Sequence, residues 1–186
     1  MGGIFRGTLR AIYLALLMSN ILHIEPLSRS AFAKYGDVIG GHMVTNDKLI
    51  NQGTTTRFET ERLSLSADDG HGEAFLYRAK GQSLPLTLRE LERHQLGSQT
   101  FVSMNGVSFV VVVALSDAAN RAPDLNTLRA FWIDGNHAIT LRAGTWHHGL
   151  IAAEDGDFVV IERVAADVDC DIAAIDPPLL LKAYAL

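Results

Sequence analysis

The sequence contains a single cysteine, Cys170, among its 186 residues. An intrachain disulfide is therefore impossible, and a chain with one thiol fits the reducing cytoplasm better than a disulfide-stabilised secreted setting. Cys170 lies between Asp169 and Asp171, and negative neighbours raise the pKa of a thiol and so reduce its reactivity. We therefore do not expect a nucleophilic role for this cysteine.

An excess of positive charge is also missing. The chain has 16 Lys and Arg residues against 21 Asp and Glu residues, which gives a formal net charge of -5. A nucleic-acid-binding protein needs a basic face for the phosphate backbone, so no nucleic-acid partner is expected. A phosphate-binding glycine loop, a His-Glu-x-x-His motif and a Gly-x-Ser-x-Gly motif are absent too. These absences remove the nucleotide-binding, zincin and serine-hydrolase interpretations.

The apolar run near the start of the chain, Ala11 to Met18, is too short to span a bilayer. It follows Arg6 and Arg10, as the apolar region of an export signal does, but no Ala-x-Ala cleavage pattern comes after it. We expect residues 1–20 to be an extension outside the fold, and residues 21–186 to form a single domain that is cytoplasmic and has no membrane partner. A cleaved export signal is the alternative.

The remaining sequence is dominated by short apolar stretches separated by Gly, Asp and Asn turns. Val107 to Leu115 is almost uniformly apolar and β-branched, which is typical of a central strand covered on both faces. Asn105-Gly106 before it is a two-residue hairpin signal. One short helix, Arg29 to Lys34, is expected after the N-cap Ser28. About ten short strands with little helix predict an antiparallel sandwich or barrel.

The segment Leu84 to His94 allows two interpretations, a strand or a helical turn. As a strand, it places Leu86, Leu88, Glu90, Glu92 and His94 on one face. Carboxylates and an imidazole in the interior are costly unless they are paired, protonated or bound to a metal, so such a face indicates a site. An interior Glu92 would have a raised pKa.

A second polar segment, Gly144-Thr-Trp-His147-His148, is expected to meet the first. Neighbours in a strand point to opposite faces, so only one of the two histidines can enter a shared pocket, and His147 has the spacing of the inward one. His148 would then serve packing or a dimer contact. The pattern Glu92-x-His94, Gln99 and Gly144-x-x-His147 shares the spacing of cupin metal motifs, with Glu92 in place of a histidine and Gln99 in place of a carboxylate.

This set of side chains leaves two possibilities open. Glu92, His94 and His147 could hold a divalent metal cation, with Gln99 as a poor fourth ligand. The alternative is a barrel that has lost its metal, whose polar residues form hydrogen bonds with one another.

Four motifs in the same order resemble those of the ureidoglycolate lyase family of the cupin superfamily. They are Asn51-Gln-Gly-Thr-Thr-Thr-Arg57, Glu92-Arg-His-Gln-Leu-Gly-Ser-Gln99, Leu128-Arg-Ala-Phe131 and Gly144-Thr-Trp-His-His148. The resemblance extends from about Ile24 to about Asp171, with Gly149 where the family is expected to have proline. It implies an all-β, cupin-type double-stranded β-helix (a jelly-roll barrel) with a few short helices, usually a homodimer. It also implies cleavage of (S)-ureidoglycolate to glyoxylate and urea in allantoin degradation.

The residue types suit that reaction, because cleavage of a hemiaminal needs one base and one acid and no covalent intermediate. Glu92, His94 and His147 are the expected catalytic residues, or the holders of a divalent cation that acidifies the hydroxyl group. Further residues are expected to bind substrate: Arg57 its carboxylate, Gln99 its ureido group, and Trp146 as a wall unless it is a core residue. Another metal-dependent cupin enzyme (an isomerase or a dioxygenase) and a non-catalytic cupin that binds a small acid are the alternatives.

Overall fold

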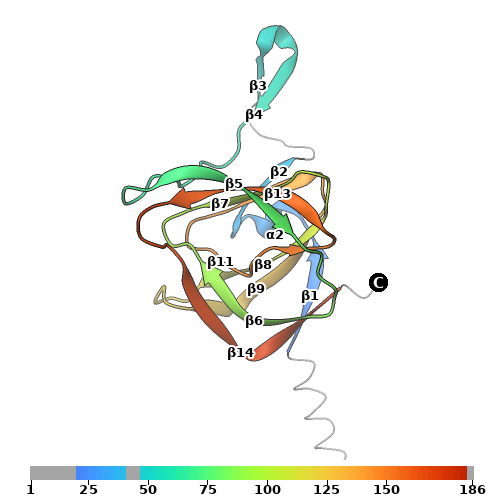
Figure 1. Cartoon of the computed structure of the whole chain (residues 1–186), viewed down its shortest axis with the longest axis vertical. Coiled ribbons are helices and arrows are strands. Elements are labelled where there is room, and N and C mark those ends of the chain that lie inside the picture. The colour runs from blue at the N-terminus through green and yellow to red at the C-terminus, as the bar shows by residue number, and fades with distance from the viewer. Residues whose placement is uncertain (1–19, 41–46, 184–186) are drawn as a thin grey trace, which may run out of the picture.

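The structure, a computed structural model, describes residues 20–40 and 47–183 of the chain. The predicted extension, residues 1–20, lies outside these ranges except for Asn20. The described part is almost entirely β-structure, as predicted (Figure 1). Its elements, in chain order, are β1 (Ile21–Pro26), α2 (Arg29–Phe32), β2 (Gly36–Gly40), β3 (Asp47–Ile50), η1 (Asn51–Gly53), β4 (Thr55–Phe58), β5 (His71–Ala79), β6 (Leu86–Arg93), β7 (Gln99–Ser103), β8 (Phe109–Ser116), β9 (Pro123–Ile133), β10 (His137–Leu141), β11 (Trp146–His147), β12 (Ile151–Ala152), β13 (Gly156–Val164) and β14 (Asp171–Lys182).

The strands form a closed barrel with a second sheet packed across it (Figure 1). The larger sheet has the order β11-β6-β14-β1-β9-β8-β12, and β11 also pairs with β8, which closes its first six strands into a ring. The second sheet has the order β2-β10-β7-β13-β5. This confirms the predicted all-β barrel of the cupin type.

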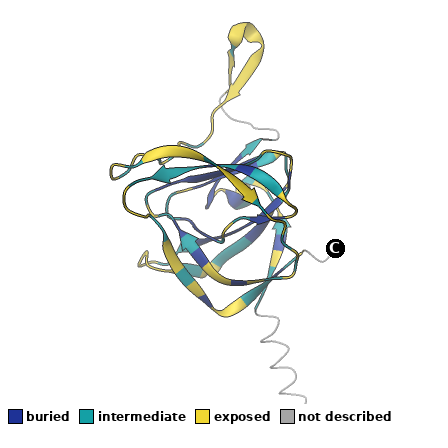
Figure 2. Ribbon diagram, in the orientation of Figure 1, coloured by how far each residue is buried: buried dark blue, intermediate teal, exposed yellow. Residues whose placement is uncertain are grey.

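Strand β8 separates two hydrophobic cores, because its side chains alternate between them. Val110 and Val112 belong to a cluster drawn from the barrel strands alone, so this cluster fills the barrel. Val111 and Val113 belong to a cluster that also contains residues of β7, β10 and β13, so it lies between the barrel and the second sheet. The prediction that this central strand is covered on both faces is confirmed, and the buried strands are visible in Figure 2.

Strand β6 confirms that the segment Leu84 to His94 forms a strand, but its side chains do not face the sides that strict alternation predicts. Leu88 and Leu91 are both buried in the barrel cluster, so the alternation changes by one residue between them. The cause lies in the pairing with β14, whose register shifts between Ala174 and Leu179. As a result Glu90 is exposed, and Glu92 faces away from the barrel interior rather than sharing a face with Leu88.

Strands β3 and β4 form a hairpin, residues 47–58, that projects from the body of the molecule (Figure 1). The segment Asn51-Gln-Gly turns the chain as η1, and the threonines after it are extended in β4, as their turn and strand preferences favour. Nearly all of its residues are exposed (Figure 2). We call this hairpin the arm.

Other local predictions need small corrections. Ser28 caps the short helix as predicted, accepting a hydrogen bond from the Ala31 amide at 3.2 Å, but the helix ends at Phe32 instead of Lys34. Strand β9 begins at Pro123, within the polar stretch Ser116 to Asn126. In the described ranges no helix is long and apolar enough to cross a membrane.

Candidate active site

Glu92 and His147 lie directly opposite each other in the antiparallel pair of β6 and β11. Opposite residues project from the same face of a sheet, so both side chains enter the space between the barrel and the second sheet. Their neighbours Arg93 and Trp146 project from the other face. His147 Nε2 lies 3.5 Å from Glu92 Oε1, and the His147 side chain is only 2% exposed.

In both histidines of the site, His94 and His147, a backbone carbonyl group determines which ring nitrogen carries the hydrogen. His147 Nδ1 donates to the Thr145 carbonyl oxygen at 3.0 Å, and His94 Nδ1 donates to the Asp169 carbonyl oxygen at 2.6 Å. A carbonyl oxygen can only accept, so each Nδ1 carries the hydrogen and each Nε2 carries a lone pair. His147 Nε2 is buried and has no hydrogen-bond partner among the described residues.

Glu92, His94 and His147 converge on one point. Each offers one ligand atom, and these three atoms lie within 4.8 Å of one another. The two imidazole rings are 5.4 Å apart between centroids. One carboxylate and two imidazoles with orientated lone pairs form a donor set that a divalent transition metal accepts, and the hydrogen bonds at both Nδ1 atoms provide the outer support typical of such sites. The residues present therefore fit a divalent cation.

The pKa of Glu92 is lowered, which corrects the expectation of a raised value. Interaction with His147 is the largest cause; burial of the carboxyl acts in the opposite direction, and positive charge on His147, His94 and His148 adds smaller attractions. The sequence argument considered burial alone, whereas the fold surrounds this carboxylate with three imidazoles. Glu92 is therefore an ionised carboxylate that can accept a proton.

His148 is closer to the site than strand alternation suggests. Strand β11 ends at His147, so the alternation argument does not extend to His148. Its side chain is half-buried, and it contributes to lowering the pKa of Glu92. His147 is nevertheless the residue that completes the cluster with Glu92 and His94, as expected.

The second sheet supplies the opposite wall of the site. Gln99 Nε2 donates to Glu162 Oε2 at 2.6 Å, and the Tyr77 hydroxyl donates to Glu162 Oε1 at 3.0 Å. Burial, together with Glu162 and Glu92, raises the pKa of Tyr77 to about 12, so this phenol stays protonated. Gln99 Oε1 is buried without a hydrogen-bond partner in the described ranges, which leaves it free to accept one from a ligand.

Tyr77 and Glu162 were missed by sequence reasoning, although a signal was present. Alternation in β13 puts Glu162 on the same face as Phe158 and Val160, which are buried in the core between the sheets. A carboxylate on a strand face that is otherwise buried and apolar indicates a functional site, as Glu92 does in β6. Tyr77 lies two positions after the partly buried Phe75 on β5, and therefore on the same face of the strand.

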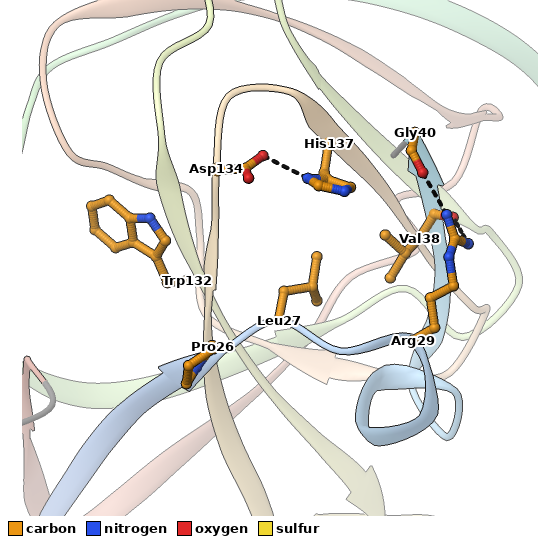
Figure 3. A pocket seen from close by; sticks show the side chains of 8 residues that line it. All are labelled: Pro26, Leu27, Arg29, Val38, Gly40, Trp132, Asp134 and His137. Atoms are coloured by element: carbon orange, nitrogen blue, oxygen red, sulfur yellow. Dashed lines mark hydrogen bonds and ion pairs between the residues drawn. The ribbon is translucent and has the colours of Figure 1, made fainter. Parts of the chain in front are cut away.

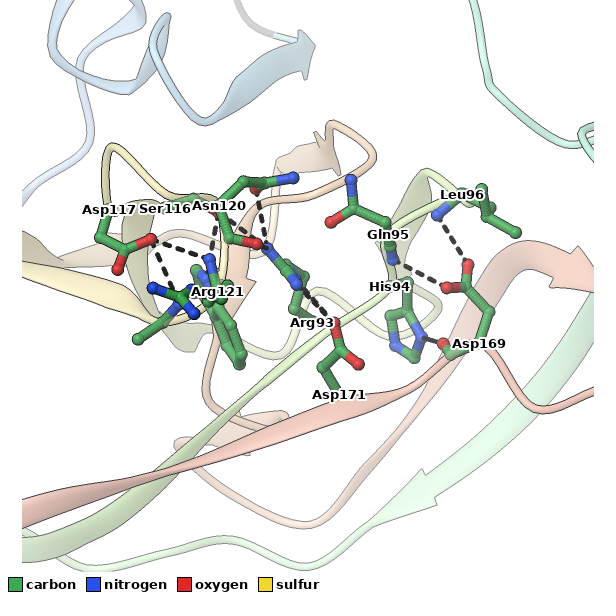
Figure 4. A network of polar contacts seen from close by, with 12 residues as sticks. Arg93, His94, Gln95, Leu96, Ser116, Asp117, Asn120, Arg121, Asp169 and Asp171 are labelled. Atoms are coloured by element: carbon green, nitrogen blue, oxygen red, sulfur yellow. Dashed lines mark hydrogen bonds and ion pairs between the residues drawn. The ribbon is translucent and has the colours of Figure 1, made fainter.

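Trp146 lies on the face opposite to His147, inside the barrel cluster. The Arg93 guanidinium stacks 4.5 Å from the centre of its ring, and Trp146 Nε1 donates to Ser116 Oγ at 3.2 Å. Arg93 in turn binds Asp171 and the side chain and carbonyl of Asn120 (Figure 4). Of the two roles considered for Trp146, this placement favours the core residue.

Asp169 organises the turn that follows His94. Its carboxylate accepts hydrogen bonds from the backbone amides of Gln95 and Leu96 at 2.8 and 2.9 Å (Figure 4). It also accepts one from the Gly97 amide at 3.0 Å. Its carbonyl oxygen holds His94 at the same time. The neighbouring Cys170 is 4.0 Å from Glu92, and burial, followed by Glu92, Asp171 and Asp169, raises the pKa of its thiol. The inertness expected of this cysteine agrees with that shift.

Two hollows in the structure have different relations to the cluster. A cavity of about 220 Å³ borders His94, Glu162 and Cys170, and is the mouth of the site. Another, of about 240 Å³, is lined by Arg29, Trp132, Asp134 and His137 together with apolar residues (Figure 3). His137 is occupied there by a 2.5 Å contact with Asp134. The second cavity contains none of the predicted site residues.

Arg57, predicted to bind the substrate carboxylate, is not part of the cluster within one chain. It lies on β4 of the arm and is exposed, and its side chain has no hydrogen bond or ion pair with any described residue. Its role remains a prediction.

Comparison with known proteins adds to this geometry. The sequence profile of the ureidoglycolate lyase family matches residues 19–182. The chain belongs to the ureidoglycolate lyase family. Ureidoglycolate lyases of Escherichia coli strain SMS-3-5 and of Shigella flexneri are each 41% identical to it over 155 residues, which cover 83% of this chain and 94% of each relative. The resemblance inferred from four short motifs is confirmed, and every predicted site residue falls within the matched ureidoglycolate lyase region.

Proposed function

We propose that this protein is a lyase that cleaves (S)-ureidoglycolate to glyoxylate and urea, at the site formed by Glu92, His94 and His147. The observation that carries the proposal is the convergence of an ionised carboxylate and two Nε2 lone pairs in a chain of this family. A cytoplasmic homodimer that acts in allantoin degradation agrees with the same membership. Nothing in the fold or the comparisons favours the isomerase, dioxygenase or non-catalytic alternatives.

The reaction moves one proton from oxygen to nitrogen. The hydroxyl proton of the hemiaminal passes to a base, the oxygen electron pair forms the carbonyl group of glyoxylate, and the C–N electrons leave with the urea nitrogen, which takes up a proton. Water is neither consumed nor released. One base and one acid on the same side of the substrate are therefore enough.

Glu92 and His147 can supply both groups. The lowered pKa of Glu92 keeps it ionised as the base that takes the hydroxyl proton. His147 Nε2, 3.5 Å from Glu92 Oε1, accepts this proton on its lone pair and delivers it to the leaving nitrogen, so both groups end in their starting states. His94 Nε2 faces the same space and can share the second role.

The same three residues would hold a divalent cation, and such a cation would act as a Lewis acid that acidifies the substrate hydroxyl. Gln99 is better placed for the ureido group than for a metal. Its Nε2 is committed to Glu162, while its free Oε1 can accept a hydrogen bond from a substrate N–H. Arg57 is the proposed partner of the substrate carboxylate, because guanidinium binds carboxylate through two parallel hydrogen bonds.

A product assay tests the proposal. Purified protein is incubated with ureidoglycolate, and glyoxylate, urea and ammonia are measured against the spontaneous decay of the substrate. The expected result is equimolar glyoxylate and urea without ammonia. Ammonia in place of urea would contradict the lyase assignment, and decay at the spontaneous rate with added divalent metal would contradict the function itself.

A further inference from the structure

The arm, residues 47–58, is a part of the fold without a structural purpose inside its own chain. Its hydrogen bonds with described residues stay within the hairpin: the β3–β4 ladder, Thr54 to Asn51, and Asn51 to Thr55. An isolated two-stranded hairpin is marginally stable in water at best. A hairpin of this kind needs contact with a second surface to become stable.

The two faces of the arm differ in chemistry. Cross-strand register puts Leu49 and Phe58 on one face, where they are 65% and 42% exposed, together with Asp47 and Thr56 at its margin. The opposite face carries Lys48 directly across from Arg57. Like charges directly opposite each other destabilise a strand pair, so this face is stabilised when an anion lies between the two cations.

The active site has the complementary composition. Its walls carry Glu92 and Glu162, and Asp167 and Asp169 line its mouth. Arg163 is the one cationic side chain, apart from His94, among the described residues that line this mouth. Arg163 is already bound to the carbonyl oxygens of Ala67 and Asp68, and its side chain is 3% exposed. Within one chain the described site therefore has no free guanidinium for the carboxylate of a substrate.

The rim of the site is apolar as well as acidic. Val168 lines the mouth and is 89% exposed, and Ile172, paired with Glu92 in β14, is 66% exposed. Exposed apolar side chains next to a binding site are typical of a surface that another protein segment covers. The apolar face of the arm matches this rim, and its cationic face matches the acidic walls.

We propose that the arm docks on a second copy of the chain and supplies Arg57, with Lys48 beside it, as the carboxylate-binding group of that copy's active site. The inference rests on the proposed function for the substrate. Two-fold symmetry makes the exchange reciprocal, so that each arm completes the site of the other copy. The active unit is then a dimer with two composite sites.

The docking step is tested first, without substrate. Sedimentation velocity of the wild-type protein should give a dimer, and Leu49→Asp should give a monomer because it places a charge on the apolar face. Thr54→Asp, a charge in the exposed turn of the same arm, is the matched control and should remain dimeric. A monomeric wild type, or a dimeric Leu49→Asp variant, would overturn the proposal whatever the enzyme's activity.

The role of Arg57 is tested by kinetics. Arg57→Ala should raise KM for ureidoglycolate roughly 10- to 100-fold, the effect of losing one charge-assisted hydrogen-bonded pair. Arg62→Ala removes an exposed arginine just outside the arm and should leave KM unchanged. An unchanged KM in Arg57→Ala would overturn the proposal.

Mixed dimers distinguish docking of the arm on the second copy from docking of the arm on the active site of its own chain. Glu92→Gln and Arg57→Ala subunits are coexpressed with different tags. The heterodimer is purified and assayed at a substrate concentration well below KM, where each parent is nearly inactive. With arm exchange one of its two sites has both Glu92 and Arg57, so about half of the wild-type activity should return. A heterodimer as inactive as its parents, beside an active wild type, would overturn the exchange while leaving the proposed function intact.

Discussion

His147 Nε2 lies 3.5 Å from Glu92 Oε1 because the two residues are directly opposite in neighbouring strands, yet they are 55 positions apart in the sequence. The backbone pairing of β6 and β11 thus fixes a carboxylate and an imidazole side by side. The position of each depends on the register of a β11 strand that is only two residues long.

Replacement of the carboxylate tests the base. Glu92→Gln should reduce kcat by about 10²- to 10⁴-fold, the usual contribution of one general acid or base. Circular dichroism and the unfolding midpoint should stay near wild type, because the side chain is only partly buried. Glu90→Gln, an exposed carboxylate two positions earlier on the same strand, is the control and should keep full activity. A fully active Glu92→Gln variant would remove Glu92 from the mechanism.

Metal affinity can be measured apart from turnover. We expect the chelator-treated protein to bind one divalent transition-metal ion in isothermal titration, and His94→Ala and His147→Ala to lose this binding, since each removes one of three ligands. His137→Ala lies outside the cluster and should bind as wild type does. Equal binding by wild type and both cluster variants would show that these residues do not hold the ion.

Asp169 is expected to act as a positioning residue. Asp169→Ala leaves the three amides of residues 95–97 without their acceptor, and should lower the free energy of unfolding by about 2–4 kcal/mol. Loss of this support for His94 should also weaken metal binding by about 10- to 100-fold. Asp167→Ala, an exposed aspartate in the same loop, provides the comparison. Chemical denaturation and titration of both variants check the two effects.

Tyr77 provides a spectroscopic prediction. Because burial and Glu162 raise its pKa to about 12, the phenol stays protonated through neutral and moderately alkaline pH and ionises only near the raised value. The absorbance change of tyrosinate should therefore be the same for wild type and Tyr77→Phe up to about pH 10, where ordinary tyrosines titrate. A difference between them in that range would show that Tyr77 is not enclosed by the site.

Several features followed from local sequence alone. The helix after Ser28, the turn at Asn51-Gln-Gly and the apolar β8 depend on capping, turn chemistry and residue type, which short-range physics determines. The cluster of Glu92, His94 and His147 was also predicted, from the spacing that these residues share with cupin metal motifs.

The tertiary structure decided what depends on distant partners. The register shift opposite β14 turned Glu90 outward and moved Glu92 to the outer face of the barrel, which strict alternation could not predict. The lowered pKa of Glu92 and the wall of Tyr77 and Glu162 arise from strands brought together only by sheet packing. Sequence determined which polar groups could meet in one cluster. Long-range strand pairing determined which way each one faces, because a change of one residue in register reverses the face of every side chain beyond it.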